Sequence, residues 1–406
     1  MASLLITNIG ELTTNDETLS PETGGRLRDA ALVVEGDRIA WVGRRTEAPV
    51  ADERFDAEGR AMLPGWVDSH THMVFAGDRT AEFEARMAGE SYAAGGINVT
   101  VNATRAAGDE QLAANLARLV AEGHRGGTTT FETKTGYGLT VVDELRSARI
   151  AGEYVDAVTF LGAHLVPAGS DAAAYLDLVT GPMLDAVAPH VSAVDVFCEN
   201  GAFDGEATSR VLEAAGAKGL ATRVHGNQLG YGPGVQLAVE HGSLSVDHLA
   251  FLTDDDVEAL AGSWSDRGRG TVATVLPACD LSTRMPLAPA KRLIEAGAIV
   301  AIASNCNPGT SYTNSMGFCV ATAVLQMGLT VQQAVRAATL GGAIALGIHE
   351  DGWLDPRGEA QPRVGVVAPG ARADLQLLGA PSVTHLAYRP GMPLTAAVWR
   401  EGHRLV

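Results

Sequence analysis

The stretch Pro64-Gly-Trp-Val-Asp-Ser-His-Thr-His72 decides how this chain is interpreted. It is a short apolar strand that runs into two histidines separated by one residue. Side chains at positions i and i+2 of a strand lie on the same face, so His70 and His72 can direct both imidazoles at one metal ion. A lone His-x-His pattern also occurs on surface strands, so the metal hypothesis depends on the rest of the chain.

Beyond this strand, apolar runs alternate with helical stretches from about residue 62 to residue 350. The segment Asp109 to Glu122 has a helical apolar face, and Thr330 with Gln333 forms a capping box ahead of another helix. Eight strand-then-helix units predict an α/β fold, a TIM (β/α)8 barrel with its chemistry at the carboxyl ends of the strands. The expected strands are Gly65–Ser69, Thr128–Lys134, Thr159–Ala163, Val194–Cys198, Ala221–Val224, Leu244–Asp247, Thr271–Leu276 and Ala298–Ser304.

Both ends of the chain have the pattern of β-hairpins. Near the start, Leu4–Ile6, Ala31–Val34 and Ile39–Val42 are short apolar runs separated by turns, with nothing helical expected between them. Near the end, Ala396–Trp399 precedes a turn and Leu405–Val406. We therefore expect a small, discontinuous β-sandwich domain built from residues 1–61 and 355–406, beside a barrel domain of residues 62–354.

Composition narrows the classes of partner. The formal net charge is -18, which disfavours binding to nucleic acid or to an anionic membrane. The N-terminal sequence lacks the features of a secretory signal, and no apolar run approaches membrane-spanning length, so a cytoplasmic protein is expected. The four cysteines have no metal-type spacing and are expected to be reduced. Cys306 could be reactive, but a small buried filler is the favoured interpretation.

The residues at the predicted strand ends are chemically useful. Five of the eleven histidines fall there, and in a barrel these positions converge on one face. A single histidine at such a position could equally serve packing, but five together are hard to explain in that way. The residues concerned are His70 and His72, Lys134 and Tyr137, His164, Glu199, His225, His248, and Asn305 with Asn307.

This set predicts metal-assisted hydrolysis. His70, His72 and His225 could supply three nitrogen ligands and leave room for a carboxylate and a water, which a divalent metal would activate. His248, or the residue at the end of the eighth strand, could serve as the base for the water proton or as the donor to the oxyanion. Arg79, in the loop after the first strand, is a candidate for gripping a substrate carboxylate with two hydrogen bonds, although it could also be an ordinary surface arginine.

Several segments, in order along the whole chain, resemble imidazolonepropionases of the amidohydrolase superfamily. The Thr-Gly-Tyr-Gly-Leu and Asn-Pro-Gly-Thr-Ser motifs are more specific than the general superfamily pattern. The matching segments are Asp68–His72, Glu82–Arg86, Glu132–Leu139, Phe160–His164, Phe197–Gly201, Val246–His248 and Asn307–Gly309.

The resemblance implies an enzyme that opens the ring of 4-imidazolone-5-propanoate to give N-formimino-L-glutamate in histidine breakdown, with one zinc or iron ion and commonly as a homodimer. It implies that Lys134 does not bridge two metals, and it leaves open whether Gln228 orients the water or contacts substrate. By position, it implies metal ligands at His70, His72, His225 and 305, catalytic roles for His248, Gln228 and 305, and substrate contacts at Arg79, Tyr137, His164, Gln228, Asn307, Gly309 and Thr310.

Asn305 departs from the family pattern, which has an aspartate there that is both ligand and proton acceptor. Asparagine keeps the shape and an oxygen that can coordinate, but it has no negative charge and cannot accept a proton near neutral pH. We therefore expect weaker metal binding and strongly reduced turnover, with substrate still bound through Arg79, Tyr137 and His164.

Two other functions remain open from the sequence. The first is hydrolysis of a different cyclic amide or deamination of a purine, for which Arg79 would matter less because a neutral base has no carboxylate. The second is a ligand-binding pseudoenzyme in which Asn305 marks lost catalysis.

Overall fold

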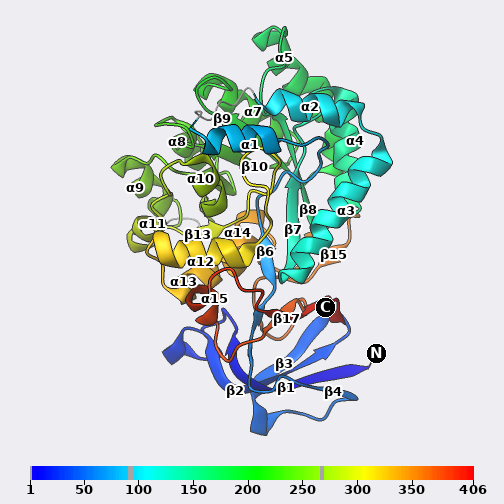
Figure 1. Ribbon diagram of the computed structural model, residues 1–406, viewed down its shortest axis with the longest axis vertical. Coiled ribbons are helices and arrows are strands. Elements are labelled where there is room, and N and C mark those ends of the chain that lie inside the picture. The colour runs from blue at the N-terminus through cyan, green and yellow to red at the C-terminus, as the bar shows by residue number, and fades with distance from the viewer. Residues whose placement is uncertain (1, 90–95, 266–268) are drawn as a thin grey trace.

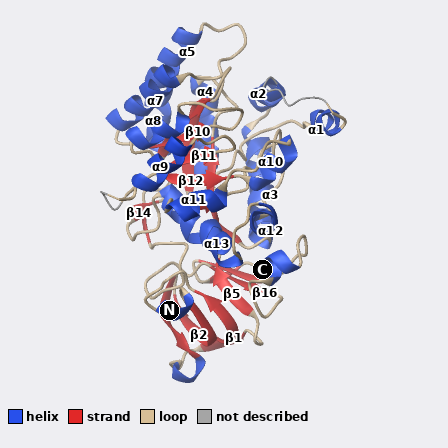
Figure 2. Ribbon diagram, turned by 90° about the vertical axis from the view of Figure 1, so that its left-hand side faces the viewer, coloured by secondary structure: helices blue, strands red, loops and turns tan. Residues whose placement is uncertain are grey.

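A computed structural model describes residues 2–89, 96–265 and 269–406 of the chain. Its central element is a sheet of eight parallel strands in sequence order, surrounded by helices (Figures 1 and 2). All eight predicted strands are present, with ends that differ by a few residues. Their bounds are β6 Trp66–Asp68, β7 Thr128–Lys134, β8 Ala157–Ala163, β9 Ala193–Cys198, β10 Ala221–Gly226, β11 Ser245–His248, β12 Val272–Val275 and β13 Val300–Ile302.

The barrel closes just beyond the carboxyl ends of its first and last strands. The backbone N–H of His72 donates to the carbonyl of Cys306 at 2.9 Å, and that of Asn305 donates to the carbonyl of His70 at 2.9 Å. The two segments run parallel, with Thr71 opposite Cys306. This closure sets the His-x-His motif directly beside the end of the eighth strand.

Helices pack around the barrel, as the apolar faces in the sequence predict. The helix predicted from Asp109 extends to Arg125, and both halves of the Thr330–Gln333 capping box are formed. The helices are α1 Thr80–Met87, α2 Ile97–Ala106, α3 Asp109–Arg125, α4 Val141–Gly152, α5 Ala172–Leu178, α6 Leu184–Val187, α7 Gly205–Ala217, α8 Gly234–Glu240, α9 Asp254–Gly262, α10 Pro277–Thr283, α11 Ala290–Ala296, α12 Met316–Gln326, α13 Val331–Arg336 and α14 Gly342–Leu346.

Strands from both ends of the chain form a second sheet, which we call the terminal sheet (Figure 1, blue and red). Strand β5 lies between β1 and β16, so the N-terminal and C-terminal strands share one hydrogen-bonded ladder. Its members are β1 Ser3–Thr13, β2 Arg26–Glu35, β3 Arg38–Arg44, β4 Glu53–Asp56, β5 Ala61–Pro64, β16 Leu375–Leu378, β17 Thr395–Arg400 and β18 His403–Arg404.

The terminal sheet differs in detail from the expected hairpins. Its strands join into one sheet with its own apolar cluster, which includes Ile6, Leu32 and Trp399. Two short 3-10 helices, Pro21–Thr23 and Arg45–Glu47, interrupt the N-terminal strands, where no helix was expected. A short hairpin, β14 Trp353–Leu354 with β15 Ala360–Gln361, and helix α15 His385–Tyr388 complete the C-terminal part. The domain boundaries at 61/62 and 354/355 stay a prediction.

A buried ion-pair cluster connects the barrel to the terminal sheet. The Arg372 guanidinium contacts Asp156 Oδ1 at 2.9 Å, Asp374 Oδ2 at 2.7 Å and Thr130 Oγ1 at 2.8 Å. Arg400, on β17, also pairs with Asp156 at 3.1 Å. Burial alone would raise the pKa of Asp156, but Arg400 and Arg372 lower it below the usual value. The cluster therefore carries charge at the contact between the barrel and the terminal sheet, with Arg372 and Asp156 buried and Arg400 partly exposed.

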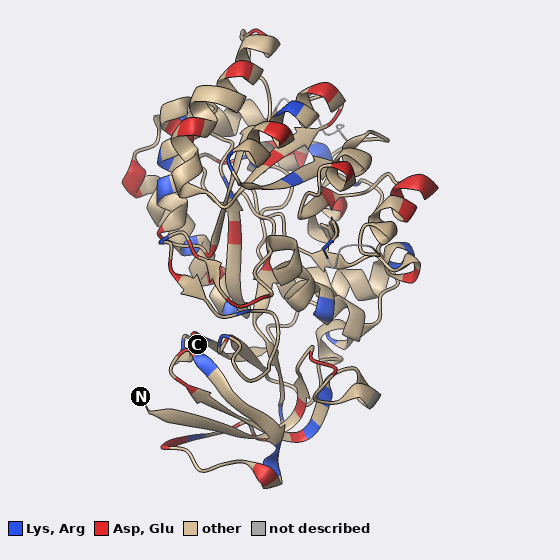
Figure 3. Cartoon of the chain, turned by 180° about the vertical axis from the view of Figure 1, so that it is seen from behind, with Lys and Arg blue, Asp and Glu red and all other residues tan. Residues whose placement is uncertain are grey.

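Charged residues of both signs are distributed along the barrel helices and the terminal sheet (Figure 3). Within the described ranges, no helix is both long and apolar enough to cross a membrane.

Candidate metal centre and active site

Three histidines converge at the carboxyl end of the barrel. The Nε2 atoms of His70 and His72 are 3.3 Å apart, as are those of His72 and His225. Ligand atoms of all three lie within 4.8 Å of one another, and all three side chains are buried. Nitrogen ligands at 2.0–2.1 Å from a tetrahedral zinc ion are about 3.4 Å apart. The observed spacing therefore fits three ligands of one metal ion.

Carboxylates on the opposite edges of the rings support the same conclusion. Asp247 Oδ2 lies 2.6 Å from Nδ1 of His70, and Asp195 Oδ2 lies 3.0 Å from Nδ1 of His225. At His70 this contact is a hydrogen bond, which holds the proton on Nδ1 and leaves the Nε2 lone pair for a metal. Asp195 lies at ion-pair distance from His225, without a hydrogen bond between the two atoms. Burial, reinforced by nearby positive charge, lowers the pKa of His70 and His72 well below 6.5. These rings are therefore neutral at pH 7, as ligands must be.

Lys134 does not belong to this cluster of ligands. Its ammonium group is fully buried, 2.9 Å from Glu132 Oε1 and 3.0 Å from Asp195 Oδ2. The ammonium group of Lys134 thus forms an ion pair with Asp195, the carboxylate that lies beside His225.

Asn305 occupies the position next to this centre. Its backbone has a φ of 53°, a left-handed conformation that asparagine and aspartate tolerate better than most residues. Its Oδ1 atom is buried and has no hydrogen-bond partner within the described part of the chain. The side chain therefore presents a bare oxygen at the place where the family resemblance implies a fourth ligand.

The three-histidine cluster opens onto a cavity of about 200 Å³. The structure brings most of the predicted site residues together around it, while His70 is fully buried behind them and Gly309 lies outside the lining. The lining consists of His72, Arg79, Ile97, Tyr137, His164, Leu165, Phe197, Asn200, Gly201, Ala202, His225, Gln228, His248, Asn305, Asn307 and Thr310.

His164 and Tyr137 form one wall of the cavity. His164 Nδ1 lies 2.9 Å from the carbonyl of Gly136, which fixes the proton on that nitrogen. Burial and the neighbouring His225 lower the pKa of His164 to about 4. The ring is therefore neutral at pH 7, with Nε2 available as a hydrogen-bond acceptor.

Arg79 forms an ion pair inside the chain at the edge of the cavity. Its Nε and Nη2 donate to the two carboxylate oxygens of Glu82 at 2.8 and 2.6 Å. The Arg79 side chain is buried, whereas that of Glu82 is 30% exposed. A Cβ on Gly309 would lie 2.1 Å from Arg79 Nη1, so only glycine allows this approach. The predicted carboxylate-binding arginine is thus already held by a carboxylate.

The loop after the eighth strand is shaped by Asn307. Its Oδ1 accepts from the backbone N–H groups of Gly309 and Thr310, each at 2.8 Å. Its Nδ2 donates to the Asn305 carbonyl at 2.7 Å and to Thr310 Oγ1 at 2.8 Å. These bonds use the polar atoms of the Asn307 side chain within the loop, which makes Asn307 a positioning residue as well as part of the cavity lining.

His248 and Gln228 complete the cavity near the metal cluster. His248 is 2% exposed with a φ of 89°, and its Nδ1 has no hydrogen-bond partner in the described ranges. Burial lowers the pKa of His248 well below 6.5. The backbone N–H of Gln228 donates to the Glu199 carboxylate. Glu199 therefore orients the segment that carries Gln228.

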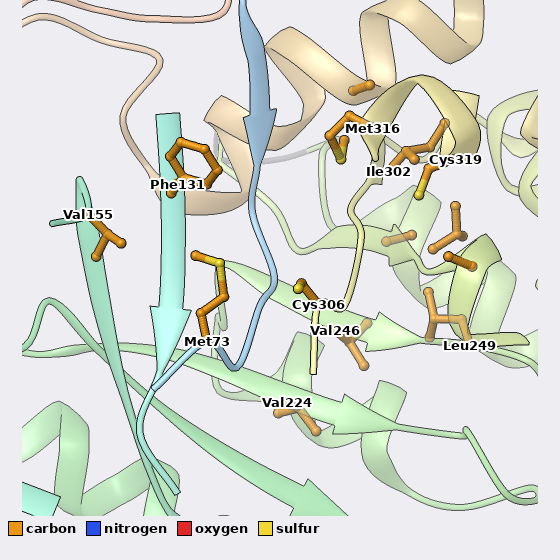
Figure 4. Close-up of a cluster of buried hydrophobic side chains, with 14 of the residues drawn as sticks. Met73, Phe131, Val155, Val224, Val246, Leu249, Ile302, Cys306, Met316 and Cys319 are labelled. Carbon is orange, nitrogen blue, oxygen red and sulfur yellow. The ribbon is translucent and has the colours of Figure 1, made fainter. Parts of the chain in front are cut away.

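Cys306 lies in the apolar interior, in the same cluster as Met73, Val224 and Val246 (Figure 4). It is fully buried, and burial raises the pKa of its thiol. All four cysteines are free and buried. The structure thus agrees with the interpretation of Cys306 as a small filler.

Three supporting carboxylates were missed at the level of sequence. Asp195 and Asp247 each interrupt an apolar strand, and a buried acid in such a strand is the signal that could have identified them. The third, Glu144 of α4, accepts from the backbone N–H groups of Gly136, Gly138 and Leu139 at 2.7–2.9 Å, and so holds the loop that carries Tyr137.

Comparison with known proteins places this geometry in a family. No model of a protein family matches the chain. The imidazolonepropionase of Saccharopolyspora erythraea, however, is 65% identical over 100% of this chain and 99% of its own length. The chain belongs to the imidazolonepropionase family. The imidazolonepropionase of Streptomyces griseus is 55% identical and is covered in full.

Solved structures share the fold of this imidazolonepropionase family member at low identity. An adenosine deaminase from Xanthomonas campestris with bound zinc has a TM-score of 0.70 at 19% identity, covering 99% of this chain and 92% of its own. Atrazine chlorohydrolase from Arthrobacter aurescens, complexed with zinc, has a TM-score of 0.70 at 16% identity, covering 99% and 95%. The fold is shared with these two zinc-bound enzymes. The chain is a hydrolase whose three-histidine cluster has the ligands and spacing to hold a metal ion.

Proposed function

We propose that this chain binds 4-imidazolone-5-propanoate in the cavity and hydrolyses a ring amide C–N bond to give N-formimino-L-glutamate. The observation that carries the proposal is the three-histidine cluster, which opens onto a cavity with a buried arginine at its edge. A planar ring with a carboxylate tail matches such a site, with the ring at the histidines and the tail toward Arg79.

Substrate binding would change the pairing of Arg79. The Nε and Nη2 donors of its guanidinium are already bound to Glu82, so the substrate carboxylate either displaces Glu82 or binds at Nη1. Tyr137 and neutral His164 flank the ring, and His164 Nε2 accepts a hydrogen bond from a ring N–H. Thr310, held by Asn307, closes the same end of the cavity.

The hydrolytic step adds water to the amide carbon, breaks the C–N bond and moves a proton to the departing ring nitrogen. His70, His72 and His225, with the Asn305 oxygen beside them, would hold a metal ion, which would supply a Lewis acid and lower the pKa of a water molecule there. His248 faces the same space and is placed to hydrogen-bond the developing oxyanion or the water, and Gln228 to orient the water. Asn305 cannot take up the water proton, so turnover is strongly reduced.

We further propose that the three-histidine cluster holds one zinc or iron ion, that the protein is a cytoplasmic homodimer, and that it has no nucleic-acid or membrane partner. The four reduced, buried cysteines and the net charge of -18 support the cytoplasmic setting and the lack of anionic partners.

The testing experiment compares the chain with its Asn305→Asp variant. Loss of substrate absorbance is followed for both, with metal content measured on the same samples. We expect the aspartate variant to be at least about 100-fold faster, since general base catalysis contributes roughly 10²–10⁴-fold. Equal rates would contradict the role of position 305, and inactivity of both metal-loaded proteins would overturn the proposed hydrolysis.

Asn305 also favours a second candidate, a ligand-binding protein without catalysis. In that case both chains bind the substrate, as calorimetry would show, but Asn305→Asp does not restore turnover. Replacing Arg79 by alanine then separates ligand classes: it abolishes binding of a carboxylate ligand but spares a neutral purine.

A further inference from the structure

A second group of potential metal ligands lies behind the cavity wall, outside the three-histidine cluster. His248 ends β11, and Cys279 and Asp280 lie in the first turn of α10, which follows β12. One ligand atom from each lies within 4.8 Å of the other two. All three are nearly inaccessible to solvent, with exposed fractions of 2%, 0% and 1%.

The hydrogen bonds of these three side chains do not use all of their possible ligand atoms. His248 Nδ1 is buried and has no hydrogen-bond partner in the part of the chain that the structure describes. The Asp280 carboxylate accepts one backbone bond, from Ala288 at 3.2 Å. The Cys279 sulfur has a long contact of 3.9 Å from Gln228 Nε2, and the side chains of Thr310 and Asn305 also lie within hydrogen-bonding reach of it. A buried imidazole nitrogen without a partner is costly, and beside a thiol and a carboxylate it indicates a missing ligand.

We propose that His248, Cys279 and Asp280 form a second cation site, which takes a thiophilic divalent metal of the zinc class. Sulfur, nitrogen and carboxylate oxygen together are a ligand set that zinc prefers over magnesium or calcium. On binding, two protons leave for solvent: one from the Cys279 thiol, and one from the Asp280 carboxyl, whose pKa burial raises to about 8. The sulfur and a carboxylate oxygen then bond to the metal. Thiolate and carboxylate then cancel the two positive charges, so the occupied site is neutral and suits a buried position.

The spacing is compatible with one metal ion. Zinc bonds of about 2.0–2.3 Å place ligand atoms about 3.3–3.8 Å apart, and the ligand atoms of these three residues all lie within 4.8 Å of one another.

Occupation of this site has a functional consequence that rests on the proposed function. His248 lines the cavity, and a metal on its ring fixes its orientation and removes its freedom to follow the reacting oxygen. Zinc beyond the first equivalent therefore inhibits ring opening, while the metal on the three-histidine cluster supports it.

Cobalt provides a direct readout of the site. The full-length protein is loaded with one equivalent of zinc and then titrated with Co²⁺, and absorbance is followed in the near ultraviolet, where cobalt–thiolate bonds absorb. We expect one further equivalent to bind with a thiolate band. Cys279→Ala should lose both, whereas the matched variant Cys319→Ala, which removes a fully buried thiol outside the cluster, should keep them.

The outcomes separate the site from the activity. Absence of the band in the unmodified chain, or its persistence in Cys279→Ala, would overturn the proposal even if the enzyme is active. If Cys279→Ala does not fold, Asp280→Asn serves instead, with at least about a tenfold weaker second equivalent expected; unchanged affinity would count against the site. A normal band in a chain without ring-opening activity would leave the second site intact and refute only the proposed reaction.

Discussion

Asp247 acts on the candidate metal centre through His70. Its carboxylate lies 2.6 Å from His70 Nδ1 and also pairs with Arg223 at 3.2 Å. Such a carboxylate fixes the tautomer of the ligand and raises its basicity, and its loss typically costs 10–100-fold in metal affinity.

We therefore expect Asp247→Asn to bind zinc about 10–100-fold more weakly, measured by competition with a chelator. The matched control is Asp177→Asn, at a surface ion pair with Arg210. An unchanged affinity in Asp247→Asn would mean that His70 is not a ligand or that its orientation is set elsewhere.

His164 links the cavity to pH. Its pKa falls from 6.5 to about 4 on folding, chiefly because of burial. The unfolded chain therefore takes up a proton below pH 6.5, whereas the folded chain does so only near pH 4. The stabilisation is present above pH 6.5 and is lost as the pH falls toward 4, by at most about 1.4 kcal/mol per pH unit for one group.

The corresponding prediction is a urea midpoint that falls between pH 6.5 and pH 4, and less steeply in His164→Gln. His403→Gln, at an exposed position, is the control and should keep the full slope. Equal slopes in all three proteins would show that His164 titrates normally.

The sequence was sufficient to bring the residues at the strand ends together, although their roles as metal ligands stay a prediction. His70, His72 and His225 were predicted as ligands from alternation and barrel geometry, and the structure brings them together. The roles of Asp195 and Asp247 depend on which ring each carboxylate faces across neighbouring strands, and spacing along one strand does not contain that information. The pairing of Arg79 with Glu82 was missed for a related reason. From the sequence, the carboxylate that accepts both hydrogen bonds of the guanidinium could belong either to the substrate or to another residue of the chain.

Helix α4 supports the loop that carries Tyr137. Glu144 is fully buried, and its carboxylate accepts from three backbone N–H groups between positions 136 and 139. Burial raises the pKa of Glu144 despite these bonds. Gly136 has a φ of 109°, and a Cβ there would lie 2.7 Å from the Leu161 carbonyl. The loop is therefore fixed both by a helix and by a glycine.

We expect Glu144→Gln to destabilise the fold by about 1–3 kcal/mol, because an amide cannot accept all three bonds as well as a carboxylate does. The Michaelis constant should rise more than the turnover number falls, since Tyr137 contacts substrate in the proposed site. Urea denaturation measures the loss of unfolding free energy. Steady-state kinetics on chains that also carry Asn305→Asp measure the Michaelis constant and the turnover number. The control is Glu153→Gln, because Glu153 directly follows the last residue of α4.

Elements with strong periodicity were predicted most closely. Strand β7 has the predicted bounds, and α3 begins at the predicted residue. Strands β6 and β13 are only three residues long, because the chain continues into closure bonds rather than a regular ladder. Apolar runs alone could not reveal that shortening.

The whole molecule depends on the contact between barrel and terminal sheet. Arg372 is 1% exposed and contacts carboxylates from both parts. Breaking one partner of such a buried network leaves uncompensated charge and typically costs 3–5 kcal/mol. We expect Arg372→Ala to lose about that much unfolding free energy in urea, compared with less than about 0.5 kcal/mol for the exposed Arg357→Ala. A small loss at Arg372 would show that water enters the contact.

The position of β5 between β1 and β16 has a consequence for biosynthesis. The ribosome releases β1 to β5 long before it makes β16, so the N-terminal strands wait with an unpaired edge while the whole barrel is translated. An edge of that kind is prone to pair with other chains. The nascent chain should therefore be most vulnerable to aggregation before residue 375 emerges, and a chaperone that shields β5 during this interval would raise the yield of folded enzyme.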